Sequence, residues 1–489
     1  MIFEKRMRIK YKTLIPLLSA LALFIISRIM YSEAGIQFQG DTYLGHWHFI
    51  DVKLLYTDLA RNVYYLHSQP PLLNLFTGMV LQIFPATHDK VFNLIYYLAG
   101  LIFTTGLYFL GNSIGLRPWI SAALSGLFII SPSAILYENW LSYSFMLATT
   151  MTLAGLFLYE FTRTKKTFFG FLFFLMLAVL ALTWSLFHIT WLYTFTLVLF
   201  FLLRRDFKKV LTAALIPVLL VTSWYTKNLI LYHEFTASSW AGMNLANITT
   251  FRLSEKERRT LQRSGELSKL ATIFPFRNPV AYLKLFPNTP LTGIPVLDDP
   301  EPNQVNHHHL VYIEASNYYL RDALKVIRLH PRIYLQSIWQ ATYIYFHSTS
   351  DFDFLYGNRK KMEAFDLWWN RSFYGQWDTG EKMESRMTTT RSIQNVSWLV
   401  VTAFLVSLIS GAYHLYKNAG KLAEAQNVLI LFMVYNILFV TVVGNMMEIG
   451  ENNRFRFAVD PFILILFIFF LQNGAALLPS QISGKAKVH

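Results

Sequence analysis

The chain has 489 residues and a net charge of +14, and 54% of its residues are hydrophobic while only 15% are charged. Because a water-soluble protein carries about 25% charged residues, this composition excludes an ordinary soluble fold and indicates a polytopic membrane protein. The basic residues fall in short clusters between apolar runs, which is typical of topology signals and not of a nucleic-acid-binding surface. The lack of cysteine excludes disulfides and thiolate metal sites.

Apolar runs long enough to cross a bilayer predict ten membrane-spanning helices. They are residues 13–31, 91–110, 119–136, 141–161, 168–184, 187–203, 210–231, 397–416, 428–446 and 459–478. The basic N-terminus is expected to stay in the cytoplasm. The apolar run behind it has no small-residue cleavage site, so we expect it to be a membrane anchor and not a removed signal peptide.

Residues 71–85 are also apolar, but this stretch is short. If it crossed the membrane, the basic clusters at 163–166 and 204–209 would face the outside. The positive-inside rule therefore favours a helix that does not cross, with eleven or more spans as the alternative.

This topology divides the chain into three parts. Residues 1–231 form a transmembrane module whose first extracytoplasmic loop is 33–90, residues 232–394 form an extracytoplasmic cap, and 395–489 hold the last transmembrane helices. We expect an all-α membrane protein of about 10–12 transmembrane helices, with interfacial helices and a large outer loop.

The first outer loop holds the first chemical signal. Apolar residues recur at spacings of three and four from Phe49 to Leu66, which predicts one helix lying in the membrane surface. Asp51 is expected on the solvated face of that helix. Asp41 precedes it, directly after Gly40 at the membrane exit, and is either an N-cap or a general base.

Charged residues recur at other outer ends of the predicted spans. Glu138 is either a second acid of a site or an interfacial acid, and Lys227 either holds a phosphate or snorkels to the surface. Arg454 and Arg456, two positions apart in Arg-Phe-Arg, suit a lipid phosphate, which arginine grips in a bidentate manner. His188 lies at an outer turn, where a hydrogen-bonded interfacial role is the simpler interpretation.

Two further patterns are weak. Consecutive histidines point in different directions, so His307-His308-His309 is more typical of a polar loop than of a metal site. Asp351-Phe-Asp353 matches a nucleotide-sugar motif of two residues, and no glycine-rich phosphate loop accompanies it.

Four of these motifs together resemble the GT-C superfamily of membrane glycosyltransferases, which use lipid-phosphate sugars and include the family 39 protein O-mannosyltransferases and the aminoarabinose transferases. The motifs are the acid after the first span, Gln69-Pro70-Pro71, Trp224-x-x-Lys227-Asn228, and Arg454-x-Arg456-x-x-x-x-Pro461. The resemblance implies a GT-C-like bundle.

The resemblance also implies roles for individual residues. Asp41 would be the general base and Glu138 a second acid, while Arg454, Arg456 and Lys227 would bind the donor phosphate. Further candidate substrate contacts are Gln69, His67, Asp51 and His188. The enzyme would move a sugar, with inversion, from a polyprenyl-phosphate donor to a lipid, glycan or protein acceptor. It would need no nucleotide, and a divalent metal is left open. A bacterial inner membrane with the site facing the periplasm is the expected location.

Two other functions compete with this one. A transporter or flippase of a lipid-linked substrate would also be a polytopic bundle, but it would place charges near the bilayer midplane and often on paired halves. An O-antigen ligase or polymerase would share the donor type, so the sequence separates it poorly.

Overall fold

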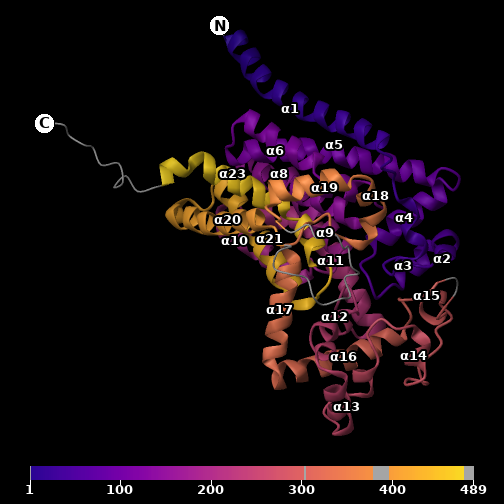
Figure 1. Ribbon diagram of the computed structural model, residues 1–489. Helices are drawn as coiled ribbons and strands as arrows, with labels where there is room; N and C mark the ends of the chain where they lie inside the picture. The colour runs from indigo at the N-terminus through magenta and orange to yellow at the C-terminus, as the bar shows by residue number, and fades with distance from the viewer. Residues whose placement is uncertain (1, 302–303, 378–395, 478–489) are drawn as a thin grey trace.

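The computed structural model describes residues 2–301, 304–377 and 396–477 (Figure 1). Helices make up 76% of the described residues, and no β-strand occurs among them, so the predicted all-α class is confirmed. A bundle of long helices lies across the upper part of Figure 1, and the cap, with helices α12 to α16, lies below it.

The bundle helices coincide with the ten apolar runs. They are α1 (Ile2–Glu33), α5 (His88–Ile114), α6 (Pro118–Ile130), α7 (Pro132–Glu138), α8 (Tyr143–Thr164), α9 (Thr167–Thr183), α10 (Ile189–Leu202), α11 (Phe207–Tyr232), α20 (Trp398–Lys417), α21 (Ala425–Met447) and α23 (Asp460–Leu477). Within the described ranges, six helices are long and apolar enough to cross a membrane, and α6 with α7 makes a seventh if they form one broken span. The apolar helices α9, α10 and α23 are shorter than that.

The predicted span 119–136 consists of two helices, not one. α6 and α7 meet at an angle of 60°. The bend lies at Ser131, whose backbone is extended (φ −61°, ψ 146°) because Pro132 follows it and disfavours the helical conformation at that residue. The Ser131 hydroxyl then accepts a hydrogen bond from the backbone N–H of Ala134 and caps α7.

The basic loops lie at one end of the bundle, as the positive-inside rule predicted. Lys165, after α8, lies 3.6 Å from Asp206, before α11. The turn after α5 contacts two C-terminal helices, because Gln426 donates to the carbonyl of Ile114 (2.6 Å) and the N–H of Arg117 donates to Gln472 (3.1 Å). The N-terminal end of α8, with the loops expected on the outer side, therefore lies at the other end, which we call the outer end after that expectation.

Short helices cover that outer end. They are the 3₁₀ helix η1 (Gly40–Leu44), α2 (Val52–Thr57), α3 (Leu59–Tyr64) and α4 (Leu72–Ile83). The single surface helix predicted for 49–66 is broken at Asp58, where φ is −140°. Asp51 is buried and caps α2 by accepting from the N–H of Lys53 (2.9 Å), so its expected place on a solvated face was wrong. The predicted apolar stripe holds only in part. Phe49, Leu59, Val63 and Leu66 are buried, but Val52 is half-buried and Tyr56 is 38% exposed.

The cap consists of short helices joined by turns. They are α12 (Ala241–Ile248), η3 (Thr250–Arg252), α13 (Glu255–Arg263), η4 (Lys269–Thr272), α14 (Pro279–Leu283), α15 (Pro295–Asp298), α16 (Val311–Leu329) and α17 (Pro331–Tyr345). α12 packs directly on α16, and a Cβ on Gly242 would lie 1.9 Å from the carbonyl oxygen of Ser316, so only glycine permits this approach.

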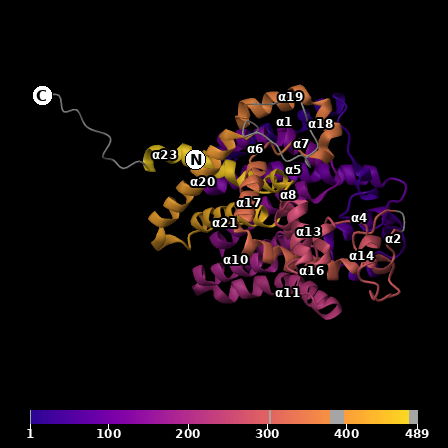
Figure 2. The ribbon, with the colours of Figure 1, turned by 60° about the horizontal axis from the view of Figure 1, so that its bottom comes forward.

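The remaining short helices follow the cap or join neighbouring bundle helices. They are η5 (Asp353–Leu355), α18 (Tyr356–Lys361), α19 (Glu363–Trp369), η6 (Asn370–Tyr374), η8 (Ala419–Lys421), η2 (Arg204–Asp206) and α22 (Asn452–Phe457). Figure 2 shows α18 and α19 at the opposite edge of the molecule from α10 and α11. α22 lies between α21 and α23 in the chain and carries Arg454 and Arg456.

Candidate active site at the outer end of the bundle

Two segments that are distant in the chain meet at residues 139–144. The backbone N–H of Gln39 donates to the carbonyl of Asn139 (2.9 Å), and that of Leu141 donates to the carbonyl of Gln39 (3.1 Å). On the other side, the Arg454 guanidinium lies 5.1 Å from the ring centre of Tyr143. The segment that carries Asp41 and the helix that carries Arg454 therefore lie at the same end of the bundle.

Arg454 is buried with two carboxylates nearby. Its Nη2 lies 2.5 Å from a carboxylate oxygen of Glu451, and the side chain is 5% exposed. Burial, followed by the negative charge of Glu451, raises the pKa of Glu448 to about 8. The sequence analysis gave neither glutamate a role. Both lie within six residues before Arg454, which indicated that they belong to the same loop.

A narrow hollow, too small to admit a water molecule, lies beside Arg454. Its lining residues are Tyr143, Ser144, Leu147, Trp184, Arg454, Phe455 and Ala458. The Nε of Arg454 and the Nη2 of Arg456 are buried and have no hydrogen-bond partner in the described part of the chain. Of these two arginines, Arg454 lines the hollow, so its unpartnered N–H lies beside it.

Arg456 is held differently. It is fully buried, its Nε donates to Asp460 (2.8 Å), and its Nη1 donates to the carbonyl of Tyr345 at the end of α17. These contacts join α22 to α17 and α23. They favour a structural role for Arg456 over the phosphate contact that the motif implied.

Asp41 lies on the surface of η1. Its side chain is exposed, and within the described ranges it makes no hydrogen bond or ion pair. The N-cap of η1 is Gln39, so Asp41 does not cap this helix. The carboxylate is therefore free to meet a substrate from the outer side.

Glu138, at the end of α7, is buried against α1. Arg28 of α1 donates through its Nε (2.9 Å) and its Nη2 to the two carboxylate oxygens of Glu138, and through its Nη1 to the carbonyl of Ile129 (3.0 Å). This bidentate pair favours a charge-pairing role over that of a second acid. Sequence reasoning missed Arg28, whose position inside the first apolar run was the signal that a partner must exist.

Lys227, near the end of α11, binds the first loop. Its Nζ donates to the carbonyls of Tyr64 (2.9 Å) and Leu66 (2.8 Å) and lies 3.6 Å from the ring centre of Trp224. It therefore fixes the loop that leads into Gln69, and it is neither a snorkelling side chain nor placed at the hollow beside Arg454. Gln69 itself is buried, without a side-chain hydrogen bond to any described residue.

His67 and His308 connect the first loop to the cap, and we call this pair the histidine latch. His67 Nε2 donates to the carbonyl of His308 (2.9 Å), while its Nδ1 accepts from the Ser239 hydroxyl (2.8 Å). His308 Nε2 donates to the carbonyl of Phe49 (2.8 Å). Burial lowers the pKa of His67 to about 3 and that of His308 to about 4, so both rings are neutral.

Two histidines that sequence reasoning passed over lie next to the latch. The ring of His46 lies 4.6 Å from that of His48 and 4.6 Å from Phe354, centre to centre. Burial, with a smaller contribution from the positive charge of Arg454, lowers the pKa of His46 to about 3. The pair lines the outer side of the Arg454 region with neutral aromatic surface.

The other candidate positions lie apart from this cluster. His188 caps α10 by accepting from the N–H of Thr190 (3.3 Å), and its ring packs on Tyr225, in keeping with the interfacial interpretation. Among the described residues, no group of three or more histidine, aspartate or glutamate side chains is arranged to hold a metal ion. His309 Nε2 donates to the carbonyl of Asp298 (3.1 Å), in a hydrogen-bonded loop.

No protein-family model and no curated protein matches this chain. Solved structures do match it. AglB, an oligosaccharyltransferase from Archaeoglobus fulgidus in complex with an inhibitory peptide and a dolichol-phosphate, is 11% identical over 96% of this chain and 52% of its own, with a TM-score of 0.42. This chain thus spans about half the length of AglB.

ArnT from Cupriavidus metallidurans matches in two states, each over 94% of this chain and 79% of its own. The apo form has 12% identity and a TM-score of 0.28, and the form bound to undecaprenyl phosphate has 11% and 0.29. AglB and ArnT are members of the GT-C superfamily to which the sequence motifs pointed. With TM-scores below 0.5, the function has to be argued from this chain's own residues.

Proposed function

We propose that this protein is an integral membrane glycosyltransferase. It moves a sugar from a polyprenyl-phosphate donor to an acceptor at the extracytoplasmic face, which in a bacterium is the periplasmic face of the inner membrane. The proposal is carried by one observation: the Asp41 segment and the Arg454 helix meet at residues 139–144. A base and a phosphate ligand are thereby brought to the same end of an apolar bundle that suits a prenyl chain.

In this proposal Asp41 accepts the proton of the acceptor hydroxyl. The hydroxyl oxygen attacks the anomeric carbon from the face opposite the phosphate, the bond from carbon to phosphate oxygen breaks, and the lipid phosphate leaves with the electron pair. The configuration at the carbon is inverted. An exposed carboxylate is a weak base, so the acceptor must cover Asp41 as it binds.

Arg454 stabilises the leaving phosphate in the same scheme. Because Glu451 already pairs with Arg454, the donor phosphate must compete with that carboxylate. We therefore infer that donor binding replaces the ion pair between Glu451 and Arg454 with one between the phosphate and Arg454. Arg456, which is fully buried by its partners, keeps α22 in place and does not touch the donor.

Asp41→Asn is expected to lower turnover at least about a hundredfold, because the amide cannot accept the proton. Transfer from a panel of polyprenyl-phosphate sugars by the purified protein measures this. The matched control is Asp58→Asn, an exposed carboxylate of the same loop, whose activity should equal that of the parent. If Asp41→Asn turns over at the parental rate, another group is the base.

Changes at Arg454 and Glu451 should move the donor KM in opposite directions. Arg454→Ala removes a charged hydrogen-bond donor and should raise the donor KM about tenfold or more. Glu451→Gln removes the competing charge and should lower it. The acceptor KM should change in neither variant. A donor KM that rises in both variants would mean that the ion pair only supports the fold.

A further inference from the structure

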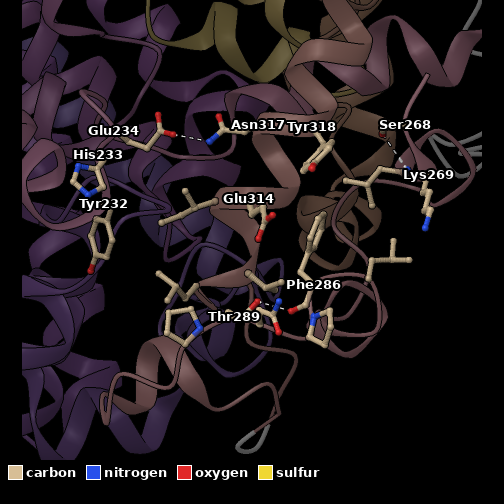
Figure 3. A pocket seen from close by; sticks show the side chains of 18 of the residues that line it. Tyr232, His233, Glu234, Ser268, Lys269, Phe286, Thr289, Glu314, Asn317 and Tyr318 are labelled. Carbon is tan, nitrogen blue, oxygen red and sulfur yellow. Dashed lines mark hydrogen bonds between the residues drawn. The ribbon is translucent and has the colours of Figure 1, made fainter. Parts of the chain in front are cut away.

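The cap contains a cavity of about 840 Å³ that lies apart from the Arg454 hollow. The end of α11, helix α16 and the turn-rich segment 285–290 enclose it. Figure 3 shows Glu234, Glu314 and Asn317 on one side of the cavity and Phe286 and Thr289 on the other. Its volume lies in the range of small-molecule binding sites, about 300–1,000 Å³.

The polar groups of this cavity include two carboxylates and several hydroxyl and amide groups. Glu234 and Glu314 contribute carboxylates, and Asn317 is already oriented, because its Nδ2 donates to Glu234 (2.7 Å) and leaves its carbonyl oxygen facing outward. One cation, Lys269, lines the cavity beside these two carboxylates. The resulting excess of negative charge disfavours a phosphate or another anion.

Two aromatic rings form part of the cavity surface. The rings of Phe286 and Tyr318 lie 5.4 Å apart, centre to centre, at 32° to each other. Both are partly exposed and line the cavity. A ligand that fits must therefore present hydroxyl donors to the carboxylates and C–H faces to the rings. Saccharides combine these two kinds of surface.

The cavity lies at the edge of the membrane-crossing part of the protein. It begins at Leu231, where the candidate span ending at Tyr232 stops. Leu229, Ile230 and Phe235 beside it are 44%, 71% and 47% exposed, so an apolar band adjoins its polar interior. A saccharide whose lipid lies in the bilayer would reach the cavity from this side.

The same cavity is connected to the candidate active site. Leu310 and Val311 line it, and they lie two and three residues after His308 of the histidine latch. Tyr232, another lining residue, donates its hydroxyl to the carbonyl of Tyr65 in the first loop (2.5 Å). A ligand in the cavity would thus contact the two segments that hold the first loop in place.

We propose that this cap cavity binds the saccharide portion of the acceptor. The proposal rests on the proposed glycosyltransferase function and names its acceptor class. Glu234 and Glu314 accept hydrogen bonds from sugar hydroxyls, and Phe286 and Tyr318 pack on the faces of sugar rings.

An equilibrium binding experiment tests the proposal without turnover. The detergent-solubilised full-length protein is applied to an array of oligosaccharides, each printed both with a free reducing end and with a lipid tail. We expect the parent protein to bind a subset of the array. Glu314→Gln and Tyr318→Ala should each weaken that binding at least tenfold, while Glu363→Gln, an exposed carboxylate of α19, should leave it unchanged. Thermal unfolding midpoints equal to the parent's establish that the variants fold.

Comparing the lipid-tailed oligosaccharides with those that have a free reducing end distinguishes a glycolipid acceptor from a soluble glycan. Binding of the lipid-tailed form alone identifies a glycolipid acceptor, and equal binding of both forms identifies a soluble or polymeric glycan. No binding to any saccharide, or equal binding by the parent and the cavity variants, overturns the proposal. The Asp41→Asn variant should bind the array as the parent does, so a failed transferase function and a failed acceptor site give different results.

Discussion

Glu138→Ala is expected to lower the free energy of unfolding by about 3–5 kcal/mol, because it leaves the Arg28 guanidinium buried without a counter-charge. The two side chains are only 11% and 4% exposed. The helices around them are tightly packed, since a Cβ on Gly100 would come within 2.6 Å of a Glu138 carboxylate oxygen. Water therefore cannot easily replace the lost carboxylate. Unfolding in a series of denaturant concentrations, in detergent micelles, measures the change.

Two variants separate charge pairing from catalysis. The double variant Arg28→Leu, Glu138→Leu removes both charges and should recover most of the lost stability, because a buried ion pair is often no more stable than an apolar pair. Glu160→Ala breaks the exposed ion pair with Arg163 on α8 and should cost less than about 1 kcal/mol. If Glu138→Ala is as stable as the parent, the pair with Arg28 does not stabilise the fold. If the stable double variant loses all transferase activity, the pair also takes part in catalysis.

The positions of the helices could be predicted from the sequence because they depend on local composition. Every predicted apolar run contains a helix, and the basic loops gather at one end as the positive-inside rule requires. The breaks were harder to predict, although one had a visible cause: Pro132 forces Ser131 out of the helix. At Asp58 the apolar stripe continues across the break, so periodicity alone indicated one helix where there are two.

The partners of charged residues could not be predicted, because they come from distant parts of the chain. Glu138 lies 110 residues from Arg28, and His67 lies 241 residues from His308. A motif identifies residue types that suit a phosphate, but burial decides which of them is accessible. Arg454 and Arg456 look equivalent in the sequence, yet Asp460 and the end of α17 occupy Arg456, while Arg454 lines a hollow.

Acidification is expected to weaken the histidine latch. The folded-state pKa values of His67 (about 3) and His308 (about 4) lie below the ordinary value of 6.5. Below pH 6.5 the unfolded chain therefore binds protons that the folded latch does not. The stability that the neutral rings contribute is fully present above pH 6.5 and is lost as the pH falls towards about 4. Lowering the pH from 7.5 to 5.5 should lower the free energy of unfolding by about 1.3 kcal/mol for each of the two rings.

The comparison of parent and His308→Gln isolates this contribution. Glu448, whose pKa is raised to about 8, acts in the opposite direction, but it titrates in both proteins and cancels in their difference. The variant should be less stable at pH 7.5, because its buried hydrogen bonds to Phe49 and Ser68 are disturbed. The difference in free energy of unfolding between the variant and the parent should be about 1.3 kcal/mol smaller at pH 5.5 than at pH 7.5. The double variant His67→Gln, His308→Gln should show about twice that change.

His233→Asn is the matched control, because His233 is exposed and its left-handed backbone (φ 58°) is one that asparagine adopts readily. A pH-dependent change in this variant as large as that of His308→Gln would mean that the effect is not specific to the latch. Hydrogen exchange reports where the protein opens: amides of the segments 46–50 and 307–311 should exchange faster at pH 5.5 than the intrinsic pH dependence allows. The free energy of unfolding that His308→Gln loses relative to the parent could instead be the same at both pH values. Proton uptake would then not act through the latch, and the contact between the first loop and the cap would be insensitive to acid.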